Sequence, residues 1–278
     1  MRERRGADPR ELGPSAHLPL TATVAGPGKS DPGLRAAAAR ADAPASPAAA
    51  PCLRRGPFAT RDLLLSAARA LAGYTVAELA RAVCSGLPSD PLRDKGFIGR
   101  VAERALGLHE LVGAPPSAAD FGALGVELKT LPVTRDLRPR ESTFVCYVRL
   151  LQLTETPWES SRVAEKLANV LFLPIESAPG LGFAQRRIGR AFLWSPSSEH
   201  TELLRTDYME LAQRVLDGHA EALDARVGRV LQLRPKAAHG AVRVRMTDGD
   251  GVPWRMQPRG FYLRASFTQQ LVAAALCD

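Results

Sequence analysis

The sequence predicts a mixed α/β fold, in which strands and helices alternate along most of the chain. Apolar residues recur at helical spacing in some segments and alternate with polar residues in others. Hydrophobic residues make up 45% of the 278 residues, which is enough for a substantial core. We find no internal repeat and no glycine-rich phosphate-binding loop in the sequence.

The first 57 residues differ in composition from the rest of the chain. They contain 14 alanines, 9 prolines and 6 glycines and no aromatic residue. Such a segment cannot bury enough apolar surface to offset the entropy that is lost on folding. We therefore expect residues 1–57 to be a disordered tail, or an over-extended start of translation, and residues 58–278 to form the folded domain.

The folded domain is expected to begin with three helices. Thr60 can cap the first, and Thr75 and Glu78 form a capping box that opens the second. Residues 95–107 carry an apolar stripe at helical spacing, with Glu103 at its edge. A carboxylate at such an edge is most often solvated, but it can also face a cleft.

A strand is expected over residues 124–133, where apolar and charged residues alternate. Glu127 and Lys129 then point to the same face of the strand. Glycines between Asp120 and this strand allow the chain to bend and to bring the Asp120 carboxylate beside Glu127. Two carboxylates and a lysine at this spacing suit a metal-dependent nuclease. The alternative is a solvated strand face, which an E-x-K pair alone does not exclude.

Further elements follow this strand. Residues 143–153 are apolar and β-branched, as is typical of a buried strand. Residues 156–159, Thr-Pro-Trp-Glu, favour the start of a helix that carries Lys166, which by itself would be read as a surface lysine. The remaining expected elements are a strand over 171–175, a helix from 198 or 199 to 216, strands at 230–234 and 242–246, a turn at 248–251, a strand through Trp254 and a last helix capped at 266–269.

The positive charge is concentrated in two segments. The net charge is +8, of which residues 1–57 contribute +4 and residues 226–264 contribute +7, so that the remainder carries −3. Within the folded domain the basic segment suits a polyanionic partner such as nucleic acid. A solvated basic face is the alternative that charge alone leaves open.

Several functional classes are not supported by the sequence. The four cysteines include no C-x-x-C pair and the five histidines show no ligand spacing, so zinc and disulfides are not expected. The sequence has no run of about 18 uncharged apolar residues. No apolar segment follows the N-terminal arginines, so we expect a cytoplasmic protein without a secretory signal.

With its elements in this order, the sequence resembles the MutH family of DNA mismatch-repair endonucleases, which nick DNA at hemimethylated GATC sites. The resemblance extends over about residues 58–278. The matching segments are 93–99 (RDKGFIG), 120–130 (DFGALGVELKT), 141–146 (ESTFVC), 158–161 (WESS), 184–189 (AQRRIG), 193–196 (LWSP), 231–238 (LQLRPKAA) and 258–263 (PRGFYL).

The resemblance implies a restriction-endonuclease-like fold, with a mixed sheet, flanking helices and two lobes around a DNA cleft. It implies that Asp120, Glu127 and Lys129 form the catalytic set. Glu103 then corresponds to an acidic residue on a helix, and Lys166 to a second lysine near the cleaved phosphate. It also implies Mg²⁺ as the cofactor, with Asp120, Glu127 and Glu103 as its ligands.

The resemblance further assigns DNA recognition to a lobe that includes about residues 226–264. Arg234 and Lys236 lie in the family's R-P-K segment, and Tyr262 matches a tyrosine that senses adenine methylation. Lys95 and Arg259, in two further matching segments, are expected as additional DNA contacts. Two departures from the family are a loop before Asp120 without the expected charges and a shorter segment around residues 237–244.

The function implied is nicking of the unmethylated strand at hemimethylated GATC by a monomer. The resemblance also implies activation by the ATPase MutL, which is recruited by mismatch-bound MutS. Two alternatives are a restriction endonuclease of the same superfamily that cuts both strands at GATC, and a DNA-binding protein with an inactive nuclease fold. The presence of all the acidic residues and lysines of the site argues against the second alternative.

Overall fold

The computed structural model describes residues 53, 56–90, 94, 96–108, 119–236, 243–247 and 253–276. Most of the predicted tail, Lys95 and the predicted turn at 248–251 lie outside these residues. The described residues belong to one compact unit, residues 44–278. The domain boundary expected at residue 57 stays a prediction.

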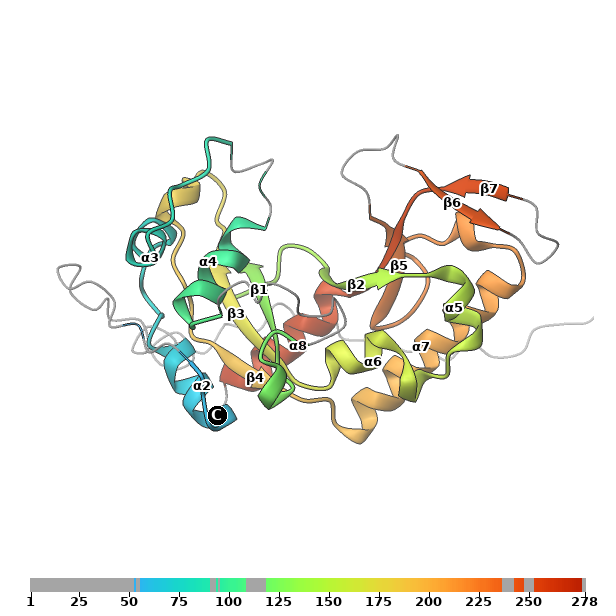
Figure 1. Ribbon diagram of the computed structural model, residues 1–278, viewed down its shortest axis with the longest axis horizontal. Coiled ribbons are helices and arrows are strands. Elements are labelled where there is room, and N and C mark those ends of the chain that lie inside the picture. Colours follow the sequence, from blue (N-terminus) through green and yellow to red (C-terminus); the bar gives the residue numbers. More distant parts are fainter. Residues whose placement is uncertain are drawn as a thin grey trace, which may run out of the picture. The chain divides into compact units, whose positions relative to one another are not determined.

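The strands of the described residues form three sheets (Figure 1). In the first, β1 (Glu127–Val133) runs parallel to β3 (Val170–Glu176), which pairs antiparallel with β4 (Phe192–Trp194). In the second, β8 (Arg259–Leu263) lies between β2 (Thr143–Val148) and β5 (Leu231–Pro235), antiparallel to both. The third consists of β6 (Val244–Thr247) and β7 (Pro253–Met256), which pair antiparallel.

Helices flank the sheets. The α-helices of the described residues are α2 (Arg61–Arg69), α3 (Val76–Ala82), α4 (Phe97–Ala105), α5 (Leu150–Glu155), α6 (Arg162–Leu167), α7 (Ser198–Leu216) and α8 (Ala265–Leu276). Parallel and antiparallel strands in one sheet, covered by helices, confirm the predicted mixed α/β class. A DNA cleft between two lobes stays a prediction.

Two hydrophobic clusters lie on opposite faces of the first sheet. Leu128 and Leu171 pack with α2, α3 and α4 in one cluster, and Val170 and Phe172 pack with α6, α7 and α8 in the other. Alternate residues of a strand point to opposite faces, so β3, which is buried on both sides, contributes to both clusters. The start of β1 is therefore held between two packed layers.

The predicted caps at the first two helices are confirmed. The Thr60 hydroxyl accepts a hydrogen bond from the Leu63 N–H at 3.3 Å. The Thr75 hydroxyl accepts one from the Glu78 N–H at 3.2 Å, and the Glu78 carboxylate accepts one from the Thr75 N–H at 2.8 Å. These bonds satisfy donors at the helix N-termini that would otherwise lack partners.

Two expected elements differ from the structure. The apolar run over residues 143–153 is a strand as far as Val148 and then forms α5, in which Leu150 and Leu153 bury one helical face. Thr156 ends α5, so the next helix begins later, at Arg162, with Ser161 as its cap. The first error arises because short apolar runs do not distinguish strands from buried helices. The second arises because the Thr-Pro-Trp-Glu signal starts only a short 3₁₀ helix, Trp158–Ser160.

Smaller differences concern element ends. The first strand begins at Glu127, because residues 122–124 form a 3₁₀ turn. The last helix begins at Ala265, before the expected cap. Among the described residues, no helix is both long enough and apolar enough to cross a membrane.

Candidate active site

A tight bend places Asp120 beside the start of β1. The Phe121 N–H donates to the Val126 carbonyl at 2.9 Å, and the Val126 N–H donates back to Phe121 at 3.3 Å. Gly125 adopts φ +61, a left-handed conformation that favours glycine. The bend allows the Leu128 N–H to donate to Oδ2 of Asp120 at 2.8 Å, so the carboxylate lies against the strand that carries Glu127.

Glu127 is the centre of the site. Its side chain is buried and each of its oxygens accepts a hydrogen bond from a different lysine. Lys129 Nζ lies 2.7 Å from Oε1, and Lys166 Nζ lies 2.8 Å from Oε2. Strand alternation predicts that Lys129 shares a face with Glu127, and the structure places the two in direct contact.

Lys166 reaches the same carboxylate from α6, 39 residues further along the chain. The helix is capped by Ser161, whose hydroxyl accepts from the Ala164 N–H at 3.2 Å. The Lys166 side chain is 7% exposed and is therefore not a surface lysine. A buried ammonium is stable here because the Glu127 carboxylate balances its charge.

Glu103 lies on α4 within electrostatic range of the other two carboxylates. Burial raises the pKa of Glu103, and the charges of Asp120 and Glu127 raise it further. Burial likewise raises the pKa of Asp120, and Glu127 adds to the effect, while the Leu128 N–H and the two lysines oppose it. Clustered, partly buried carboxylates with raised pKa values are typical of functional sites.

These acids match a hard divalent cation in their donor chemistry. Carboxylate oxygens are the ligands that Mg²⁺ prefers, and bound positive charge would relieve the repulsion between the acids. Among the described residues, however, no group of three or more His, Cys, Asp or Glu side chains is arranged to hold a metal ion. The predicted ligand set of Asp120, Glu127 and Glu103 is therefore not gathered into a metal site in the described residues, and both oxygens of Glu127 accept hydrogen bonds from lysines.

The raised pKa of Glu103 leads to a prediction about stability. Its carboxyl stabilises the fold while protonated, and this contribution is lost as the pH rises through the folded-state pKa. Without divalent cations, we therefore expect Glu103→Gln to raise the melting temperature at about pH 7, with the gain shrinking toward zero at about pH 4. Thermal unfolding in a chelator at the two pH values measures this.

The control for this prediction is Glu165→Gln, because Glu165 is an exposed carboxylate on α6. It should leave the melting temperature unchanged at both pH values. Addition of Mg²⁺ should raise the melting temperature of the unsubstituted protein more than that of Glu103→Gln. Equal melting temperatures for Glu103→Gln and the unsubstituted protein at about pH 7 would contradict the assigned repulsion.

The second sheet presents a cation–aromatic face, formed by Phe144, Arg234, Lys236 and Tyr262. The Arg234 guanidinium lies over the Tyr262 ring, 4.9 Å from its centre. Lys236 Nζ lies 4.7 Å from the centre of the Phe144 ring and 6.0 Å from that of Tyr262. The Phe144 and Tyr262 rings meet edge to face at 5.4 Å. Three of the predicted DNA contacts are thus brought together.

The other two predicted DNA contacts have different outcomes. Arg259 is 5% exposed, and its guanidinium donates to the carbonyls of Leu223 at 2.6 Å and Glu221 at 2.8 Å. Because these bonds hold the group inside the fold, the structure argues against DNA contact by Arg259 and gives it a structural role. Lys95 lies outside the described residues, so its DNA contact stays a prediction.

Two features of β2 were not assigned a role from the sequence. Phe144 occurs in the matching segment 141–146, and its neighbouring cations are visible only in the fold. The Val145 carbonyl accepts a hydrogen bond from Lys129 Nζ at 3.4 Å, which links this strand to the candidate active site. No sequence signal identifies a backbone carbonyl as a partner.

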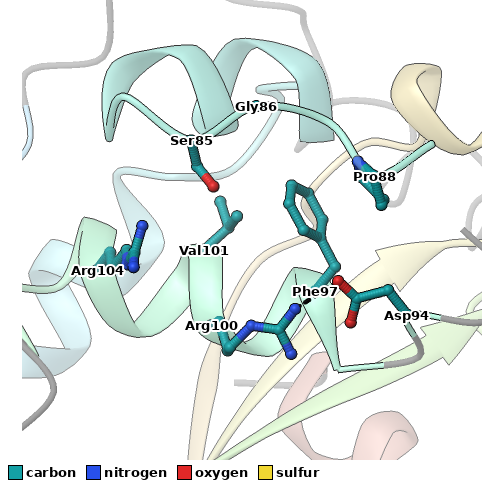
Figure 2. Close-up of a pocket in the computed structure, with 8 residues that line it drawn as sticks. All are labelled: Ser85, Gly86, Pro88, Asp94, Phe97, Arg100, Val101 and Arg104. Atoms are coloured by element: carbon teal, nitrogen blue, oxygen red, sulfur yellow. Dashed lines mark hydrogen bonds and ion pairs between the residues drawn. The ribbon is translucent and has the colours of Figure 1, made fainter. Parts of the chain in front are cut away.

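A pocket of about 200 Å³ lies beside α4, between this helix and the segment that follows α3 (Figure 2). Its lining includes Phe97 and Asp94, and Arg100 pairs with Asp94 at 2.5 Å. None of the predicted site residues that the structure describes lines this pocket. We therefore assign it no part in catalysis.

A mixed sheet flanked by helices, with Asp120 and a Glu-x-Lys pair at the start of a strand, defines a nuclease of the restriction-endonuclease-like class. Residues 114–207 match the family model "DNA mismatch repair enzyme MutH". The DNA mismatch repair proteins MutH of Salmonella paratyphi B, Salmonella newport and Salmonella heidelberg are each 46% identical over 217 residues, which is 78% of this chain and 93% of each relative. The chain belongs to the MutH family of DNA mismatch-repair endonucleases.

Proposed function

We propose that the protein nicks the unmethylated strand of DNA at hemimethylated GATC sites by Mg²⁺-dependent hydrolysis of one phosphodiester bond. The observation that carries this proposal is the pairing of Glu127 with Lys129 and Lys166, next to Asp120 and Glu103. The site therefore contains negative and positive groups that can serve two steps of hydrolysis, the activation of water and the stabilisation of charge on the phosphate.

Each residue of the site has a distinct role in this proposal. Asp120, Glu127 and Glu103 would hold Mg²⁺, which supplies charge neutralisation and a water of lowered pKa when bound. Lys129 Nζ, 16% exposed as a side chain, can orient the attacking water. The Lys166 ammonium group is buried away from bulk water and would offset negative charge on the phosphate.

Binding of Mg²⁺ at Glu127 would compete with the two lysines for the carboxylate. Each Glu127 oxygen accepts a hydrogen bond from one lysine and keeps a second lone pair for a metal ion, whose charge would weaken these ion pairs. The pair with Lys129 is the more accessible, because the Lys129 side chain is 16% exposed and that of Lys166 is 7% exposed. Approach of a phosphate would give the released ammonium a new anionic partner.

The cation–aromatic face is the proposed site of sequence and methylation recognition. Arg234 and Lys236 supply the positive charge that DNA attracts, and they sit on aromatic rings that limit their freedom. The adenine N6 group lies on the major-groove edge, where an added methyl group would clash with a closely packed ring. A monomer with one such site would cut a single strand.

The proposed partners follow from membership of the family. We propose activation by MutL and, through it, dependence on mismatch-bound MutS. The cytoplasmic location expected from the sequence stays part of this proposal.

One assay tests the proposal. Purified protein and Mg²⁺ are incubated with unmethylated, hemimethylated and fully methylated GATC plasmids, with and without MutL. We expect nicking of the unmethylated strand, stimulation by MutL and little cutting of the fully methylated plasmid. Double-strand cutting of unmethylated DNA without MutL would instead favour a restriction enzyme, and the absence of cutting under all conditions would overturn the proposal.

Tyr262 offers a specific test of methylation recognition. Its ring is on the face of β8 opposite Phe261 and contacts Phe144 and Arg234, and 9% of the residue is exposed. We expect Tyr262→Ser to reduce the ratio of cleavage rates on unmethylated and fully methylated GATC duplexes. Cutting at altered GATC sequences should stay slow, because Arg234 and Lys236 remain. An unchanged ratio would rule out this role for Tyr262.

A further inference from the structure

A β-bulge in β2 determines which side chains reach the cation–aromatic face. Phe144 pairs with Tyr262 and Cys146 pairs with Phe261, so Val145 is an extra residue without a partner on β8. Directly paired residues of antiparallel strands lie on the same face, and a bulge shifts the alternation by one residue. Cys146 therefore points into the core, and Tyr147, opposite Gly260, shares the face of Phe144 and Tyr262.

Tyr147 is strongly exposed at this position. Its exposed fraction is 55%, and it is the one aromatic residue among the strongly exposed large hydrophobic side chains of the described part of the chain. Tyrosine is enriched at interfaces, because its ring is apolar and its hydroxyl group can form hydrogen bonds. The opposite residue, Gly260, has no side chain that could cover the ring.

The contacts of Tyr147 connect it to the predicted DNA-recognition residues. Its ring meets Phe144 edge to face, with 5.2 Å between the ring centres. Phe144 in turn contacts Tyr262 and Lys236. Burial raises the pKa of the Tyr262 hydroxyl, Arg234 opposes this, and the nearby Tyr147 hydroxyl adds to the rise. Tyr147 thus extends the cation–aromatic face toward solvent.

We propose that Tyr147 is a DNA-binding residue whose ring packs against base edges and deoxyribose of the duplex beside the recognition site. This inference rests on the proposed function, because it takes the cation–aromatic face as the surface that binds DNA. The positive charge of Arg234 and Lys236 attracts the phosphates, and the ring supplies apolar contact between them. A tyrosine provides this contact area at a low cost in side-chain entropy.

The test compares Tyr147→Ala and Tyr147→Phe with Met209→Ala as the matched control. Met209 is 61% exposed on α7, so its loss removes a similar exposed apolar side chain elsewhere. Binding to a fluorescently labelled GATC duplex is measured in a chelator, where no cleavage occurs, at several salt concentrations. We expect Tyr147→Ala to bind about tenfold more weakly, and Tyr147→Phe and Met209→Ala to bind as the unsubstituted protein does.

The salt dependence separates an apolar contact from a charge effect. The slope of the logarithm of the binding constant against that of the salt concentration should be the same for Tyr147→Ala and the unsubstituted protein, because no phosphate contact is lost. Unaltered binding by Tyr147→Ala, or a smaller slope, would overturn the inference and leave the proposed function in place. If the unsubstituted protein bound no duplex, the proposed function and the inference would both fail.

Discussion

Replacing Glu127 by glutamine should reduce DNA nicking by at least about 10²–10³-fold, because the variant cannot hold both lysines of the site. The carboxylate bonds Lys129 through Oε1 and Lys166 through Oε2. An amide has one acceptor oxygen, and its NH₂ group would face the second lysine. Because both of these groups are donors, no hydrogen bond can form between them. The measurement is the rate of nicking of hemimethylated plasmid at saturating enzyme.

DNA binding should survive this substitution, because the cation–aromatic face lies on a different sheet and loses no contact. Glu165→Gln, an exposed change on α6, is the matched control and should nick at the unsubstituted rate. Lys129→Ala is expected to lose nicking as well. Nicking by Glu127→Gln or Lys129→Ala at the unsubstituted rate, with normal thermal unfolding, would show that the site is misassigned.

The sequence predicted those parts of the site that depend on short-range geometry. Strand alternation placed Glu127 and Lys129 on one face, and the glycines before β1 indicated the bend that brings Asp120 to Leu128. Both inferences could be made from neighbouring residues and from the two-residue period of a strand. The contact of Lys166 with Glu127 spans 39 residues and was not predicted; only the resemblance to the MutH family indicated that Lys166 belongs to the site.

Other features depended on tertiary contacts that no local pattern encodes. A basic residue in a basic segment was expected to meet DNA, but the Arg259 side chain points inward to the carbonyls of Glu221 and Leu223. The bulge at Val145 reverses the alternation of β2, so period-two reasoning places Tyr147 on the wrong face. Residues 143–153 contain no glycine or proline that would indicate this bulge.

A buried carboxylate outside the candidate active site supports the second sheet, which carries the cation–aromatic face. Asp207 on α7 is 1% exposed and accepts hydrogen bonds from three consecutive backbone N–H groups. Arg229 donates to Oδ1 at 2.8 Å, and Val230 and Leu231 donate to Oδ2 at 2.6 and 2.7 Å. The chain enters β5 at this point, three residues before Arg234, so Asp207 fixes the start of the strand that carries a predicted DNA contact.

A tight turn makes this arrangement possible. Gly228 adopts φ +83, and a Cβ atom there would lie 1.9 Å from the Leu231 carbonyl oxygen. The turn therefore requires glycine, and it aims the three N–H groups at one side chain. The Val230 and Leu231 N–H groups are buried, so their hydrogen bonds depend on the carboxylate.

Asp207→Asn should lower the free energy of unfolding by about 1–3 kcal/mol. The amide has one acceptor oxygen, so in either orientation at least one of the three backbone N–H donors would face its NH₂ group. The midpoint of urea unfolding should fall while its slope stays the same. Asp217→Asn, an exposed change just after α7, is the control and should alter stability by less than about 0.5 kcal/mol. Equal midpoints for Asp207→Asn and the unsubstituted protein would show that β5 is held without this carboxylate.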